Sequence, residues 1–408
     1  MKPSPLAPAA IPALPGIAGV ELAAYPCNIR YRDRPDVLLA TFAEDTQVAG
    51  VFTESKVVAA PVSWCRRALK GRRARALVVN AGNANAFTGK EGLQSVERVI
   101  SATAKMLGCK PEQVFMASTG VIGEPLPDHK IIEALPTLKW TLNANAWVNA
   151  VQAIMTTDTF MKMATKTVRI GTTPVTTNGI AKGSGMIAPN MATLLAFVFT
   201  DAAIPAAVLQ RLLAEANDRS FNSITVDGDT STNDTLMAFA TGKAEHKPVK
   251  TTNDVHLRAF KAALQEVLTD LAIQVVKDGE GAQKFVAIEV HGAKSEKAAR
   301  AIALTIANSP LVKTAIAGED ANWGRIVGAA GRAGEYLVQE KIKVSIGGVL
   351  VAKNGARVKG YDEAPVVTHM KGQYIDIRLD LGVGKGNAKV YTCDLTHGYI
   401  DINGSYRS

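Results

Sequence analysis

One short segment in the middle of the chain limits the possible folds most strongly. Residues 194–199, LLAFVF, are six apolar side chains in a row, and polar residues follow them directly. A run this short and this continuous is typical of a strand that is buried on both faces. The segment therefore predicts a sheet with packing layers on both sides.

Strand-like and helical patterns alternate along the rest of the chain. Residues 76–80 (ALVVN) form an apolar run that ends in a Gly- and Asn-rich loop, which indicates a strand and a turn. Apolar residues at helical spacing predict helices after this loop, after Pro205 and around residues 257–271. Residues 375–381 alternate Ile and Leu with Asp and Arg, as in a strand with one wet face. Together these elements predict an α+β fold of layered sheets with packed helices.

Length and composition are those of a folded globular chain with one large core or two smaller lobes. The chain has 408 residues, of which 47% are hydrophobic and 20% charged, and it lacks the run of about 20 apolar residues that a membrane span needs. The first 16 residues are rich in Pro and Ala, and we expect a loose leader on a cytoplasmic protein. The four cysteines are scattered without a CxxC pair, which favours reduced, buried thiols over a metal site or disulfides.

The net charge of +9 admits two interpretations. Basic residues can form a nucleic-acid footprint or a solvated surface. The densest cluster lies within residues 66–75 and has only Trp64 as an aromatic neighbour. We therefore expect these basic residues to form a solvated surface, with neither nucleic acid nor a membrane as a partner.

The most unusual stretch is 182–197, KGSGMIAPNMATLLAF. It begins with Lys182, contains two glycines and a Pro-Asn turn, and then runs through Thr193 into the buried strand. Gly183 and Gly185 allow the backbone to approach another group closely. Taken alone, the segment is more consistent with an ordinary turn than with a catalytic site.

This stretch resembles the cleavage-site signature of the ornithine acetyltransferase family, the bifunctional glutamate N-acetyltransferases. Further motifs resemble those of the family and occur in the family's order. They are ASTGVIGEPLP at 117–127, TTDTF at 156–160, FNSITVDGDTSTNDT at 221–235, KDGEGAQKF at 277–285, GEDANWGRI at 318–326 and the terminal DINGSYRS. The resemblance covers the chain from about residue 16 to its last residue. It implies the architecture of a self-processing N-terminal-threonine acyltransferase, shared with aminopeptidase-like enzymes.

The resemblance implies that the chain cuts itself between Ala192 and Thr193. The products would be an α chain of residues 1–192 and a β chain of residues 193–408 that stay associated, in the family as a heterotetramer of two α and two β chains. A threonine hydroxyl is a weak nucleophile that needs an adjacent base. The freed α-amine of Thr193, with a reference pKa near 8, can take the hydroxyl proton, so no catalytic histidine is required.

The resemblance also assigns the remaining site residues. Thr119 and Gly120 would stabilise the oxyanion, although a tight turn before Pro125 is the alternative. The substrate contacts would be Thr157, Lys182, Thr193, Glu280, Asn403 and Ser408. Lys182 would bind a carboxylate and Glu280 an amine, although either charge alone could be a solvated loop residue. Asn403 and Ser408 require that the C-terminal tail docks.

Two positions depart from the family pattern, and two motifs are misleading. Met161 stands where the family usually has Pro, and Ser408 where many relatives have Thr. The loop 382–387 (GVGKGN) lacks the spacing of a phosphate-binding loop and is expected to be a turn. The acidic run VDGDTSTND lacks the downstream Glu of an EF-hand, and by resemblance it is a structural motif near the site. No metal is expected.

The function implied by the resemblance is acetyl transfer from N-acetylornithine to glutamate in arginine biosynthesis, by a ping-pong mechanism through an acetyl-threonine. No cofactor is expected, and acetyl-CoA stays open as a second donor. The alternatives are a self-processing aminopeptidase-type hydrolase and, outside enzymes, an uncut scaffold or binding protein.

Overall fold

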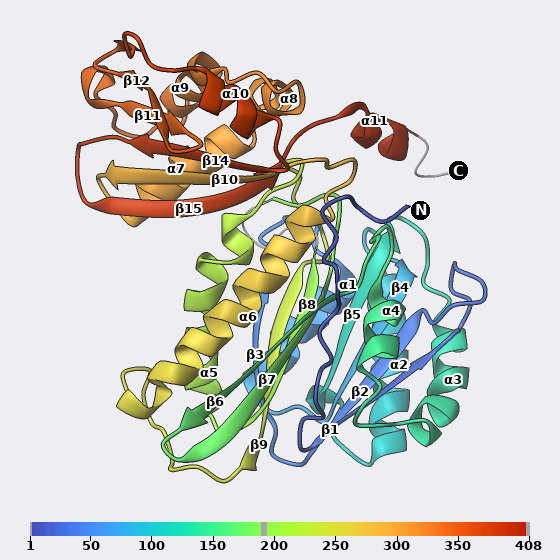
Figure 1. Ribbon diagram of the computed structural model, residues 1–408. Helices are drawn as coiled ribbons and strands as arrows, with labels where there is room; N and C mark the ends of the chain where they lie inside the picture. The colour runs from blue at the N-terminus through green and yellow to red at the C-terminus, as the bar shows by residue number, and fades with distance from the viewer. Residues whose placement is uncertain (1, 189–193, 405–408) are drawn as a thin grey trace.

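Two sheets packed face to face form the body of the molecule (Figure 1). The computed structural model describes residues 2–188 and 194–404. The first sheet has the strand order β1-β2-β4-β5, with β1 (Val20–Tyr25), β2 (Val37–Phe42), β4 (Ala76–Asn83) and β5 (Val114–Val121). The second has the order β3-β9-β8-β7-β6, with β3 (Gln47–Phe52), β6 (Lys162–Ile170), β7 (Thr173–Lys182), β8 (Leu195–Ala202) and β9 (Thr235–Ala244).

Aromatic side chains fill the space between these two sheets. The Phe42 ring stacks on Phe239 with centroids 4.3 Å apart, and Phe199 stacks on the same ring at 5.7 Å. Trp147 meets Phe199 edge-on from α4 (Trp147–Ile154), which packs against this core. Such ring pairs add to the large apolar area that each aromatic side chain buries.

Helices cover the outer faces of both sheets, so the body has four layers (Figure 1). The first sheet is covered by α1 (Ala60–Ala68), α2 (Gly89–Leu107) and α3 (Asp128–Trp140), and the second by α5 (Ala206–Asp218) and α6 (Arg258–Lys277). Strand β8 is central and buried along almost its whole length, which confirms the prediction from its apolar run. Within residues 2–188 and 194–404, no helix combines the length and apolar character needed to cross a membrane.

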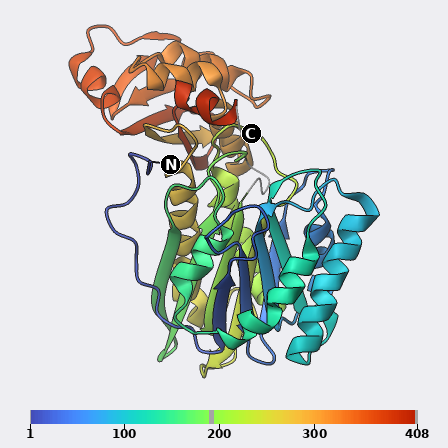
Figure 2. The ribbon, with the colours of Figure 1, turned by 90° about the vertical axis from the view of Figure 1, so that its right-hand side faces the viewer.

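A C-terminal lobe sits on one end of this sandwich (Figures 1 and 2). Its sheet has the order β13-β12-β11-β14-β10-β15, with β10 (Phe285–Ala293), β11 (Lys343–Ile346), β12 (Val349–Lys353), β13 (Ala356–Arg357), β14 (Tyr374–Asp380) and β15 (Gly386–Cys393). Helices α7 (Glu296–Ala307), α8 (Pro310–Ala317), α9 (Trp323–Gly331) and α10 (Ala364–Met370) accompany the sheet. Exposed and buried residues alternate along β14, as its sequence predicts. The fold is thus the predicted α+β arrangement of layered sheets.

Short segments connect these elements. Helix α11 (His397–Asn403) follows the last strand and lies to the right of the lobe, above the end of the body, in the view of Figure 1. Single 3-10 turns occur at Leu69–Gly71, Pro111–Gln113, Phe221–Ser223, Val255–Leu257 and Gln339–Lys341.

The expectation of a loose leader is wrong for the part of the N-terminal segment that the structure describes. Leu6 and Leu14 are buried in the two main cores, with 3% and 8% of their surface exposed. The Ser4 hydroxyl donates to the Lys277 carbonyl at 2.6 Å. An extended, Pro-rich segment can thus pack through isolated leucines, without the periodic pattern that identifies a helix or a β-strand.

Candidate active site

A pocket of about 400 Å³ opens where several strands of the body end beside the C-terminal helix. Six of the residues predicted from the sequence line it: Thr119, Gly120, Thr157, Lys182, Glu280 and Asn403. The other lining residues are Ala84, Val121, Ile122, Thr156, Gly185, Met186, Ser231, Thr232 and Asn233. The predicted Ala192, Thr193 and Ser408 lie outside the described residues. Their roles, like those of the six, stay predictions.

Thr119 and Gly120 lie near the end of β5, where β5 runs beside β4. Gly120 has φ +134°, and a Cβ atom there would meet the Gly82 carbonyl carbon at 2.2 Å. The Asn233 side chain donates to the Ala84 carbonyl at 2.6 Å and to the Ser118 carbonyl at 2.8 Å. The hydrogen bond to Ser118 fixes the backbone just before Thr119. The close approach of the β4 and β5 backbones explains why position 120 requires glycine.

Lys182 ends β7 and is buried, with 4% of its surface exposed. Its Nζ donates to the Thr119 hydroxyl at 3.2 Å. Burial lowers the pKa of the Lys182 ammonium below its usual value, and the Asp158 carboxylate only partly offsets this. A solvated loop charge is therefore excluded for Lys182, and an anion entering the pocket would meet an amine with little competing water.

Glu280 faces Lys182 from the loop after α6. Its backbone N–H donates to the Ser184 carbonyl at 3.0 Å, and its carboxylate accepts from the Asn403 amide at 2.8 Å. Burial raises the pKa of the Glu280 carboxyl, while hydrogen bonds from Asn403 and Thr157 oppose the rise. The pocket therefore presents one basic and one acidic group to a small molecule, as an amino acid requires.

Helix α11 brings Asn403 to the pocket. The Thr396 hydroxyl donates to the Gly281 carbonyl at 2.6 Å, and the Tyr399 hydroxyl lies 3.3 Å from an Asp227 carboxylate oxygen. The tail thus docks at least as far as Asn403, which is the condition that the predicted contact needs.

Comparison with known proteins identifies the family. The family model described as "ArgJ family" matches residues 21–408.

The chain belongs to the ArgJ family.

Curated relatives with the name "Arginine biosynthesis bifunctional protein ArgJ" match over the whole length. The protein from Gluconobacter oxydans is 58% identical over 409 residues, covering 100% of this chain and 96% of the relative. That from Bradyrhizobium diazoefficiens is 56% identical over 408 residues, covering 99% of each. A crystal structure of the Bacillus halodurans arginine biosynthesis bifunctional protein is 40% identical, with a TM-score of 0.48, over 50% of this chain and 96% of that chain.

Two polar residues of this ArgJ-family chain, Asn233 and Asp234, were not named individually as site residues from the sequence, although their motif was expected near the site. The Leu194 N–H donates to Asp234 Oδ1 at 2.8 Å, and Asn233 makes the contacts described above. Asp234 is fully buried, and its Oδ2 has no hydrogen-bond partner among the described residues. Burial raises the pKa of the Asp234 carboxyl well above its usual value. The sequence signal was the motif at 221–235, which contains both residues and which the resemblance places near the site.

The acidic run VDGDTSTND accepts hydrogen bonds from backbone N–H groups. The Asp227 carboxylate accepts from the N–H groups of Met186 and Ile187 at 2.6 and 2.9 Å. It thereby fixes the loop that leads from Lys182 towards residue 188. Among residues 2–188 and 194–404, no group of three or more His, Cys, Asp and Glu side chains could hold a metal ion.

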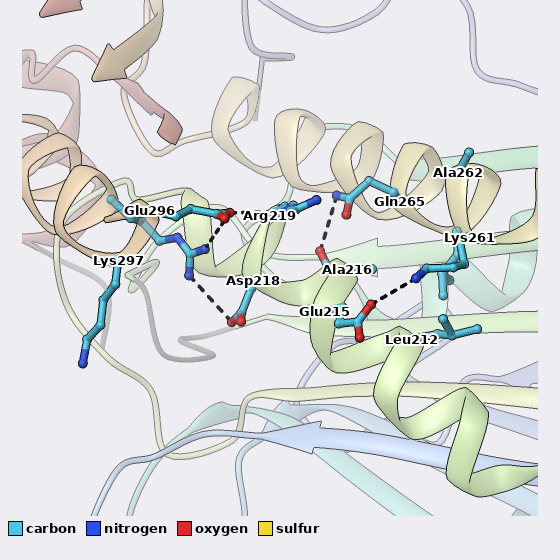
Figure 3. A pocket seen from close by; sticks show the side chains of 12 residues that line it. Leu212, Glu215, Ala216, Asp218, Arg219, Lys261, Ala262, Gln265, Glu296 and Lys297 are labelled. Atoms are coloured by element: carbon cyan, nitrogen blue, oxygen red, sulfur yellow. Dashed lines mark hydrogen bonds and ion pairs between the residues drawn. The ribbon is translucent and has the colours of Figure 1, made fainter. Parts of the chain in front are cut away.

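A larger pocket of about 640 Å³ lies elsewhere, between α5, α6 and α7 (Figure 3). Its charged side chains pair mainly with each other: Arg219 with Glu296 at 3.3 Å, Arg300 with Asp218 at 3.8 Å. These groups are partly exposed, so they interact weakly. Size alone does not make this pocket the active site, and none of the predicted residues lines it.

Proposed function

We propose that this chain transfers the acetyl group of N-acetylornithine to glutamate in arginine biosynthesis, after cutting itself between Ala192 and Thr193. Membership of the ArgJ family supports the pathway, because the curated relatives carry arginine biosynthesis in their names. The observation that carries the reaction is the pocket in which Lys182 and Glu280 meet beside Thr119 and Gly120.

The proposed reaction has two half-reactions at one nucleophile. The Thr193 hydroxyl attacks the acetyl carbonyl, the amide C–N bond breaks, and the freed amine of ornithine takes up the proton. The amine of glutamate then attacks the threonine ester, the ester C–O bond breaks, and Thr193 regains its proton. Thr119 and Gly120 would stabilise the oxyanion in both halves.

Charges of both signs suit this pair of substrates. Both carry an α-carboxylate for Lys182, and one has an amine side chain where the other has a carboxylate. No bound cofactor is required in this proposal, and acetyl-CoA would enter only as an alternative donor.

A two-substrate assay tests the proposal. Purified enzyme with N-acetylornithine and glutamate should release ornithine and N-acetylglutamate in equal amounts, with parallel-line ping-pong kinetics. Acetyl-CoA in place of N-acetylornithine would reveal a second donor. Hydrolysis of peptides without acetyl transfer would instead favour the aminopeptidase-type alternative.

The proposed cut has its own readout. A denaturing gel should show fragments of 192 and 216 residues (408 minus 192), and the second fragment should begin with the sequence that starts at Thr193. Thr193→Ala should leave one intact chain without transfer activity. In the proposal two α and two β chains form a heterotetramer, which light scattering can measure. An intact, active wild-type chain would contradict the assignment of Thr193.

A further inference from the structure

We propose that three buried charged residues beneath the pocket, Asp158, Lys162 and Asp278, form a positioning triad that holds the substrate-binding side chains in register. The proposal rests on the function proposed above. It concerns how Thr157, Lys182 and Glu280, which come from three separate parts of the chain, are placed relative to one another.

The triad is a closed ionic cluster. Lys162 Nζ donates to Asp158 Oδ1 at 2.6 Å and to Asp278 Oδ2 at 2.5 Å, and all three side chains have 0% of their surface exposed. Burial lowers the pKa of Lys162, but its two carboxylate partners outweigh burial and the net shift is upward. Burial acts on Asp158 in the opposite direction, and Lys162 together with Lys182 outweighs it, so the pKa of Asp158 lies below its usual value. Burial raises the pKa of the Asp278 carboxyl, and Lys162 offsets this only in part. We conclude that the Lys162–Asp158 pair is charged.

Asp158 connects the triad to two of the three binding side chains. Its carboxylate accepts from the Thr156 N–H at 2.9 Å and from the Gly183 N–H at 2.7 Å. Thr156 precedes Thr157, and Gly183 follows Lys182. One carboxylate therefore fixes the backbone next to both residues.

Asp278 connects the triad to the third binding side chain. It accepts from the Thr159 N–H at 2.9 Å and also from the Thr159 hydroxyl. Glu280 is only two residues further along the chain, and its own N–H bonds the Ser184 carbonyl. The loop that carries Thr157 and the loop that carries Glu280 are thus tied to the same cluster.

A buried ionic cluster is a costly way to gain stability, because apolar residues of similar volume often hold a fold equally well. What the cluster adds here is geometry: directed hydrogen bonds to four backbone or side-chain groups around the pocket. The backbone at the proposed oxyanion residues Thr119 and Gly120 is supported separately, through Asn233, and the Thr119 hydroxyl alone also contacts Lys182. Substrate binding and nucleophile chemistry should therefore be separable by experiment.

The test compares two acetyl donors in the charge-balanced double variant Lys162→Met/Asp278→Asn. N-acetylornithine needs the binding side chains, whereas p-nitrophenyl acetate has neither an α-amine nor an α-carboxylate and needs only the nucleophile and the oxyanion residues. We expect kcat/KM with N-acetylornithine and with glutamate to fall by about 10²-fold, as a misplacement of about 1 Å can cause. The burst of nitrophenolate that reports acetylation of the enzyme should stay near wild type.

Milder variants keep the test decisive if the double variant does not fold. Thr159→Val removes the hydroxyl bonded to Asp278, and Thr159→Ser keeps it, so only the valine variant should lose amino-acid substrates selectively. Lys284→Met is the matched control, because Lys284 is also a buried lysine but donates to Met370 and Gly372 carbonyls in the C-terminal lobe. It should lower the thermal midpoint without changing the ratio of the two activities.

Three results would overturn the proposal. In a folded triad variant, an equal fall with both donors would show a merely structural role, and unchanged kinetics would show no role. Equal kinetics of Thr159→Val and Thr159→Ser would show that the hydrogen bond from the Thr159 hydroxyl to Asp278 has no role in positioning. A wild-type enzyme that reacts with p-nitrophenyl acetate but transfers nothing from N-acetylornithine would instead overturn the proposed function.

Discussion

At the scale of single residues, Glu280 shows how little space separates the groups of the pocket. Its carboxylate is held by Asn403, and the backbone at Gly185 passes directly beside it. A Cβ atom on Gly185 would lie 2.3 Å from Glu280 Oε2, although the backbone there has no positive φ that would exclude alanine. Gly185 is therefore required by its neighbour.

We predict that Gly185→Ala displaces the Glu280 carboxylate and leaves the fold intact, because the clashing atoms are at the end of a flexible side chain. kcat/KM with N-acetylornithine should fall about 10- to 100-fold, as expected for a small misplacement in a binding site. Steady-state kinetics and thermal unfolding measure the two effects. Gly71→Ala is the control, because a Cβ at Gly71 meets nothing within 4 Å. Wild-type kinetics in Gly185→Ala would contradict a role of Glu280 in binding.

The sequence predicts which residues belong to the site far better than it predicts their surroundings. Motif resemblance names Lys182 and Glu280, yet each alone is also consistent with a solvated charge. The decisive fact is burial, and the charge of the buried Lys182 is favoured by Asp158, which lies 24 residues earlier (182 minus 158) and reaches it only through the fold. Local pattern carries no information about such a pairing.

At the scale of elements, α11 is held on the body by close backbone contact. Gly281 has φ +76°, and a Cβ atom there would meet the Tyr399 backbone nitrogen at 2.4 Å. No residue of this seven-residue helix is buried. Its docking thus depends on hydrogen bonds and on the missing side chain at position 281.

We predict that Gly281→Ala detaches α11 and removes Asn403 from the pocket. Limited proteolysis should then trim the C-terminal segment faster, and kcat/KM should fall while the rest of the chain stays folded. Part of any stability loss comes from the positive φ itself, which alanine adopts at a cost of about 1 kcal/mol. Gly360→Ala controls for this, because Gly360 has φ +65° and open space around it. Equal proteolysis of the two variants would argue against the contact.

The predictability of an element follows from how it is stabilised. The apolar run of β8 and the alternation of β14 reflect burial on two faces and on one, so both strands are predictable. Helix α11 has no buried stripe, and the N-terminal segment packs through isolated leucines. Neither leaves a periodic pattern, and so neither could be predicted from periodicity.

At the scale of the whole molecule, the large core between the two body sheets includes the thiol of Cys65. Cys65 has 0% of its surface exposed, and burial raises its pKa from the usual 9.0 to about 12. The folded chain therefore keeps a proton that the unfolded chain releases. Stability must fall as pH rises through this window.

We predict a loss of about 1.4 kcal/mol per pH unit from this thiol between pH 9 and 12. Cys65→Ala should lower the slope of unfolding free energy against pH by that amount, measured by urea titration at several pH values. Val79→Ala, in the same core, should shift stability equally at every pH, since it creates a cavity without an ionisable group. The same slope in Cys65→Ala and wild type would exclude the thiol as the cause.

The layered architecture was predictable from the sequence, whereas the order of strands was not. Each sheet mixes parallel and antiparallel neighbours, as with β8 beside β9 and β7. The choice among such orders is made by packing between distant segments. The separate C-terminal lobe likewise has no linker in the sequence that would reveal it.

The strand order of the five-stranded sheet has a consequence for the order in which the chain folds and is cut. Strands β3, β7 and β6 precede residue 192, whereas β9 and β8 follow it, inserted between β3 and β7. A cut at the proposed position would leave two interlocked polypeptides, one with the paired strands β8 and β9 and the other with β3 on one side of them and β7 and β6 on the other. Their separation would take β3 from β9 and β7 from β8, so the β8–β9 pair would have two unpaired edges. Folding must therefore precede cutting, and fragments synthesised apart would have to assemble this sheet from unfolded chains.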